Sequence, residues 1–153
     1  MFTDPRVVDY ITQHYVPVRV HVKENAAAFR ELRARYSAEW TPAVLILDDE
    51  GREQHRIEGF LPADDFLSQL ALGLAKAAFA RKDYAIAAPL FRAVVDDHPD
   101  TETAPEALYW AGVSQYRATN DPSALKETGE ALKSRYGNSS WAKKGSVWLG
   151  GVK

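Results

Sequence analysis

The chain has 153 residues, 46% hydrophobic and 26% charged, which is the composition of a folded globular protein and excludes a disordered or fibrous one. Its 19 Lys and Arg nearly balance its 21 Asp and Glu, and a net charge of −2 gives no strong attraction for nucleic acid or an anionic membrane. The absence of cysteine excludes disulfides, thiolate nucleophiles and thiolate metal sites in this chain.

Helix and strand signals alternate at the start of the chain. Asp4-Pro5 predicts a helix start, because Asp accepts hydrogen bonds from free amides and Pro fits the first turn; this helix should run to about residue 13. The alternating valines of residues 16–22 predict a strand. Residues 25–36 carry apolar side chains at helical spacing and predict a second helix.

A hairpin and a third helix should follow. The aliphatic run at residues 43–47 predicts a buried strand, which is far too short to cross a membrane. Residues 48–51 predict a turn with Gly51 at positive φ, and residues 52–58 predict the returning strand. The buried face of the next helix should consist of Phe66, Leu67, Leu70 and Leu74. We expect that helix to continue into the second half of the chain, because no linker-like segment separates the halves.

Two short motifs carry a family resemblance. Trp40-Thr41-Pro42 precedes the aliphatic strand, and Ile57-Glu58-Gly59-Phe60 closes the hairpin. With the order of the elements, they make residues 1–70 resemble a thioredoxin-like α/β domain without its first strand. The resemblance implies a cis bond before Pro42. It implies no redox activity, because the Cys-x-x-Cys motif of the family is absent here.

The missing strand is central in that family, so the strand of residues 16–22 should lie two strand spacings, about 10 Å, from residues 43–47. Buried unpaired amides are costly, which leaves three alternatives. The strands close up, or another chain fills the slot as in a homodimer through an open sheet edge, or the chain is a shortened thiol–disulfide oxidoreductase with its redox motif upstream of Met1. The resemblance starts abruptly at Met1, which favours the shortened oxidoreductase. A cytoplasmic location is expected, or a periplasmic one if an upstream signal is missing.

The second half contains a repeated pattern. Ala87 and Phe91, followed by Pro99, resemble the second helix and closing turn of a tetratricopeptide repeat. A constant offset of 37 residues relates Ala75 to Gly112, Ala87 to Ala124, and Pro99 to Tyr136. Residues 141–148 resemble a capping helix. The resemblance implies that residues 71–153 form all-α helical hairpins; an unrelated helical bundle is the alternative.

Signals for catalysis, metals and cofactors are weak. The four histidines lack metal-binding spacing, and glycine-rich phosphate loops and nucleophile-elbow motifs are absent from the sequence. The acidic residues 48–50 belong to the predicted turn. We therefore expect neither a metal site nor a cofactor, and no catalytic residue is assigned.

Two groups of residues are candidates for binding a protein or peptide. The resemblance implies that Trp40, Thr41 and Pro42 line a peptide groove; alternatively, Trp40 fills the space left by the missing segment. The aromatic candidates on the helical repeats are Tyr84, Tyr109, Trp110 and Tyr116; the alternative is that they belong to the core. The sequence thus favours a non-catalytic binding module.

Overall fold

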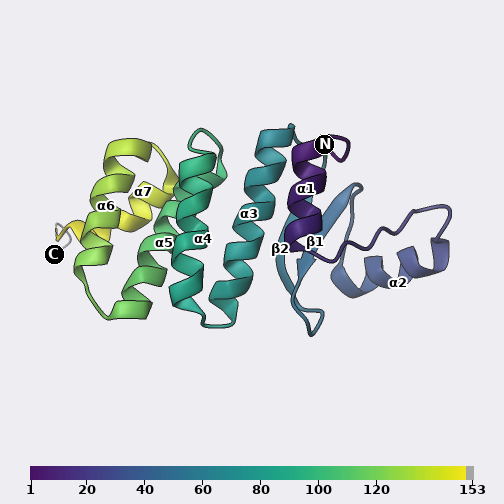
Figure 1. The fold of residues 1–153 in the computed structure, drawn as a ribbon, viewed down its shortest axis with the longest axis horizontal. Coiled ribbons are helices and arrows are strands. Elements are labelled where there is room, and N and C mark those ends of the chain that lie inside the picture. The colour runs from purple at the N-terminus through teal and green to yellow at the C-terminus, as the bar shows by residue number, and fades with distance from the viewer. Residues whose placement is uncertain (151–153) are drawn as a thin grey trace.

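The computed structural model describes residues 1–150. Figure 1 shows an elongated molecule with a small sheet towards one end, α3 in the middle and a stack of helices at the other end. In chain order the elements are α1 (Pro5–His14), α2 (Ala26–Tyr36), β1 (Ala43–Leu47), β2 (Glu53–Glu58), α3 (Ala63–Ala80), α4 (Tyr84–Asp97), α5 (Thr103–Thr119), α6 (Ser123–Tyr136), α7 (Ser140–Gly145) and the 3₁₀ helix η1 (Ser146–Leu149). None of the helices described is both long and apolar enough to cross a membrane.

Local signals placed α1 and the hairpin correctly. The Asp4 carboxylate accepts a hydrogen bond of 2.9 Å from the Arg6 amide and caps α1, with Pro5 at the first helical position. Strands β1 and β2 pair antiparallel, and Gly51 in the turn between them has a φ of 78°. The bond between Thr41 and Pro42 is cis, as the resemblance implies.

The predicted strand at residues 16–22 is wrong. Within residues 1–150 the sheet has two strands, β1 and β2, and the backbone of residues 16–20 forms no hydrogen bond. Val16 and Val18 are 94% and 82% exposed. A strand needs a neighbouring strand to satisfy its amides, and this segment lies beside none, so its alternating valines remain in an irregular connection to α2.

Helix α3 continues from one half of the molecule into the other, as the sequence predicts. One core packs Phe66, Leu67 and Leu70 of α3 against α1 and the sheet. A second core begins half a turn further on and includes Leu72 and Ala75 of the same helix. Its other fully buried members are Ala78, Ala87, Phe91, Val94, Val95, Ala107 and Ala111. The predicted boundary at residue 70 therefore falls inside a continuous helix.

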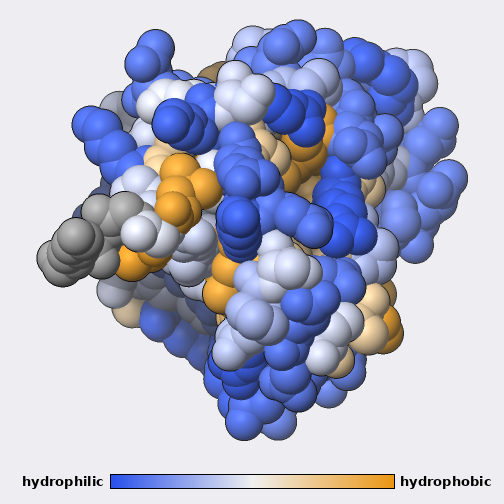
Figure 2. Space-filling model, turned by 90° about the vertical axis from the view of Figure 1, so that its left-hand side faces the viewer, coloured by the Kyte–Doolittle hydropathy of each residue, from blue (hydrophilic) through white to orange (hydrophobic). Residues whose placement is uncertain are grey.

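The helices after α3 form hairpins. The pairs α3–α4 and α5–α6 pack side by side, with α7 and η1 against the last pair (Figure 1). Figure 2 shows the end of the molecule formed by these last helices, where the surface is mostly hydrophilic and hydrophobic residues appear as small separate areas. A polar outer face of this kind is what the terminal unit of a helical stack requires.

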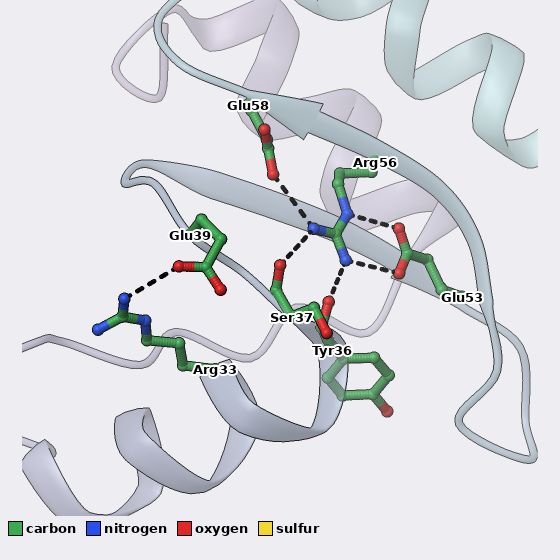
Figure 3. A network of polar contacts seen from close by, with 7 residues as sticks. All are labelled: Arg33, Tyr36, Ser37, Glu39, Glu53, Arg56 and Glu58. Atoms are coloured by element: carbon green, nitrogen blue, oxygen red, sulfur yellow. Dashed lines mark hydrogen bonds and ion pairs between the residues drawn. The ribbon is translucent and has the colours of Figure 1, made fainter.

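Arg56 is one of the residues that tie α2 to the sheet (Figure 3). The Arg56 guanidinium on β2 pairs with Glu53 at 2.6 Å and with Glu58 at 3.1 Å, and it donates to the carbonyl oxygens of Tyr36 and Ser37 at the end of α2. These two carboxylates raise the pKa of Arg56. Since carbonyl oxygens at a helix C-terminus lack intrahelical donors, Arg56 caps α2 as well as anchoring it.

The close approach of α5 and α6 depends on a glycine. A Cβ atom added at Gly112 would lie 2.6 Å from Cβ of Thr128, whose hydroxyl already donates to the Ala124 carbonyl. We predict that Gly112→Ala lowers the free energy of unfolding by about 1–3 kcal/mol, through overpacking. Urea denaturation followed by circular dichroism measures this change.

Thr128→Gly supplies the control for that variant. The double variant should lose less stability than the sum of the two single losses, because the clash is removed. Strict additivity would contradict the proposed contact between the two helices.

Candidate functional site

Aromatic side chains from four helical elements lie in contact along one side of the helical stack. The ring of Trp110 on α5 is 5.1 Å from that of Phe79 on α3 and 6.3 Å from that of Trp141 on α7. Its neighbour Tyr109 stacks on Trp148 of η1 at 4.7 Å. Edge and stacked contacts of this kind add to the burial energy of the rings, so they hold the hairpins in register.

A groove of about 270 Å³ opens between these rings and the sheet. We call it the aromatic groove. Its lining residues are Gln54, Lys76, Phe79, Phe91, Glu106, Trp110 and Trp141. They come from β2 and from α3, α4, α5 and α7, so the groove exists only when the sheet and the helical hairpins are packed together.

A chain of polar contacts crosses beside the groove. Nζ of Lys76 lies 2.8 Å from the Glu106 carboxylate and 3.5 Å from Nδ1 of His55, while Nε2 of His55 lies 2.6 Å from the Gln69 side-chain oxygen. Lysine can only donate, so Nδ1 is the acceptor and Nε2 carries the proton donated to Gln69. The contacts therefore hold a neutral His55 and balance the charge of Lys76 internally.

Burial is the main reason that the pKa of His55 is lowered from its usual value of 6.5. The hydrogen bond to Gln69 opposes this effect, and the nearby Lys76 cation lowers the pKa further. The groove thus combines aromatic faces with an internally paired lysine and glutamate, beside a neutral imidazole, which suits an uncharged, apolar ligand better than a charged one.

Comparison with protein families matches residues 1–73 to the thioredoxin-like domain and residues 69–101 to the tetratricopeptide repeat. The chain thus contains a thioredoxin-like domain followed by a tetratricopeptide repeat, over residues 1–101. No curated protein and no solved structure matches it. The two matched segments overlap within α3, the helix that both cores share.

The structure brings together some of the aromatic residues predicted on the repeat half. Trp110 lines the aromatic groove, and Tyr109 packs directly behind it, 5.3 Å between ring centroids. Tyr84 contacts the same cluster through Phe79 but lines a separate hollow, and the Arg117 guanidinium lies over its ring. Tyr116 is half-buried on α5 and is not a lining residue of the groove.

The residues predicted on the thioredoxin-like domain lie elsewhere. Trp40 is 69% exposed and so does not fill an internal space. The Pro42 carbonyl accepts a 2.8 Å hydrogen bond from the Gly59 amide, which brings Trp40 and Thr41 to the end of the hairpin where the exposed Phe60 also lies. This second candidate surface is separate from the aromatic groove.

Several lining residues were missed from the sequence. Lys76 and Phe79 are three residues apart on α3, and Glu106 and Trp110 are four apart on α5, so each pair shares one helical face. That spacing was the available signal, but it does not show that the two faces converge. Within residues 1–150 no group of His, Asp and Glu is arranged to hold a metal ion.

The protonation of His55 can be tested directly. We predict that this histidine titrates below 6.5 in the folded protein, and that Lys76→Met raises its pKa by removing a neighbouring cation. An NMR titration of the imidazole ring measures both values.

The lowered pKa of His55 also makes the stability of the fold depend on pH. The unfolded chain takes up a proton at His55 at a higher pH than the folded chain does, so the free energy of unfolding falls as pH drops below about 6.5. This loss should be smaller in His55→Gln, measured by urea denaturation between about pH 7.5 and about pH 5.5. A folded-state pKa at or above 6.5 would contradict the prediction.

Proposed function

We propose that this chain is a non-catalytic protein-interaction module that binds an extended, apolar peptide segment of a partner in the aromatic groove. The observation that carries the proposal is the convergence of Phe79, Trp110 and Trp141 on one open groove. Half-buried aromatic rings are the commonest anchors in binding surfaces, because they offer large contact areas with few rotatable bonds.

The polar side chains of the groove favour an uncharged peptide segment over a charged one. Lys76 and Glu106 satisfy each other at 2.8 Å, so neither offers a free charge to attract an ionic side chain. The side-chain amide nitrogen of Gln54 donates to Asp48 at 3.1 Å, which leaves its oxygen to accept from a peptide amide. An apolar residue flanked by exposed backbone amides would match both features.

Two further points support a binding role. The family of the repeat half generally mediates protein interactions, and the thioredoxin-like domain here has no cysteine with which to perform thiol–disulfide exchange. The surface around Trp40 and Thr41 is the alternative place for a peptide, because its aromatic side chains are exposed. Substitutions at Trp110 and at Trp40 distinguish the two surfaces.

Selection from a displayed library of random peptides on the full chain provides probes. We predict that the enriched peptides are apolar or aromatic, and that Trp110→Ala weakens their binding by about tenfold or more, as expected for a central anchor. Fluorescence anisotropy of a labelled peptide measures the affinity.

Trp40→Ala is the matched control, since it removes the same side chain outside the groove and should leave the affinity unchanged. Trp141→Leu changes the neighbouring aromatic residue of the groove lining in case Trp110→Ala unfolds, and thermal melts confirm that each variant is folded. Peptides that lose affinity with Trp40→Ala, and not with either groove variant, would place binding at the hairpin end and refute the proposal.

A further inference from the structure

The chain of polar contacts beside the aromatic groove contains one group that can change its charge near neutral pH. His55 on β2 is half-buried, and its Nδ1 lies 3.5 Å from Nζ of Lys76, a lining residue of the groove. Lys76 in turn pairs at 2.8 Å with the carboxylate of Glu106, another lining residue. The charge of His55 therefore acts at short range on the two ionic side chains that a bound peptide would meet.

The charged groups that act on His55 come from three elements. Lys76 on α3 disfavours its protonation, while Glu106 on α5 and Glu53 on its own strand favour it. Strand β1, which pairs with β2, contributes only aliphatic side chains. The uncharged Gln69 on α3 accepts the Nε2 proton of His55 at 2.6 Å. A second proton must therefore bind to Nδ1, the ring nitrogen that faces the Lys76 ammonium.

Protonation changes the net charge of this group of side chains. When His55 is neutral, the Lys76 cation and the Glu106 anion balance each other. With a proton on Nδ1 the three side chains carry a net positive charge, and the Lys76 ammonium loses Nδ1 as an acceptor. Because all three side chains are partly buried, solvent screens the added charge only in part, and the charge acts on whatever occupies the groove.

We propose that protonation of His55 switches the specificity of the aromatic groove from uncharged peptide segments to segments that carry a carboxylate beside their apolar residue. This inference rests on the proposed binding of peptides in the groove. The Lys76 ammonium, without its contact to Nδ1, is the lining cation that would donate to the peptide carboxylate. Peptide Asp and Glu, with ordinary pKa values of about 4, stay ionised where a histidine titrates. A cationic peptide side chain would instead meet like charge.

Peptide binding and the protonation of His55 must influence each other. If protonated His55 favours an acidic peptide, that peptide must raise the pKa of His55 by the same free energy. An uncharged peptide should not raise this pKa, because excluding water from the groove disfavours a charged imidazole. Burial and Lys76 lower the pKa of His55 below 6.5 in the free chain, so the change in specificity should occur on the acid side of that pH.

Matched peptides test this change in specificity. An apolar peptide that binds the full chain is synthesised in pairs, with either Glu or Gln at each flanking position in turn. At one or more of these positions, the affinity of the Glu peptide relative to the Gln peptide should rise by about fivefold or more between about pH 7.5 and about pH 5. Fluorescence anisotropy measures both affinities, and circular dichroism confirms that the chain is folded at each pH.

Three variants identify the group responsible. His55→Gln should keep the ratio of the two affinities constant with pH. His14→Gln, which changes an exposed histidine on α1, should behave like the wild-type chain. Glu106→Gln removes the anion that balances Lys76, so it should already favour the Glu peptide at about pH 7.5.

An NMR titration of His55 in the wild-type chain gives a readout that requires no variant. The bound Glu peptide should raise the pKa of His55 relative to the bound Gln peptide. The inference would be overturned by a His55 that stays neutral down to about pH 5, by an affinity ratio that is constant with pH at every flanking position, or by a change that persists in His55→Gln. If binding in those cases still depends on Trp110, the proposed function stands and only the switch fails. Peptide binding that is unaffected by Trp110→Ala would refute both.

Discussion

The structure depends on α3 being buried on two sides. Phe66 and Leu70 face α1 and the hairpin, while Leu72 and Ala75, only a few residues later, face α4 and α5. Gly73 directly follows Leu72, and a Cβ atom there would overlap the Ile46 side chain, so the helix can approach the sheet only without one. A two-stranded sheet with one helix would be marginal on its own, and it gains stability because α3 is also held by the helical stack.

The same helix creates the candidate site. Because α3 touches both halves, Lys76 can reach His55 on the sheet and Glu106 on α5 at once, and Phe79 can meet Trp110. The groove therefore depends on the junction between the sheet and the helical hairpins. A partner bound there would contact both, which gives a physical reason for joining the two units without a linker.

The sequence predicted most of the features that depend on residues close together in the chain. Asp4-Pro5 placed α1, Gly51 placed the hairpin, and the 37-residue offset placed the second helical hairpin, because caps, turns and helical spacing act over a few residues. The prediction failed where the structure of a segment depends on residues far away in the sequence. Residues 16–22 alternate as a strand does, but they lie beside no other strand. The groove was predicted only in part, since Trp110 was identified while the convergence of Phe79 and Trp141 on it depends on packing between helices.

Cooperative unfolding of both halves through α3 is the most direct test of this account. Leu70→Ala removes a side chain from the core beside the sheet and should cost about 2–5 kcal/mol. In a Trp40→Phe background, tryptophan fluorescence reports on α5, α7 and η1, far from the substitution. We predict that the fluorescence and far-ultraviolet circular dichroism transitions move to the same lower temperature in the Leu70→Ala variant. A fluorescence transition that stays at the temperature of the background protein would show that the helical stack is stable without the sheet, and would contradict the account.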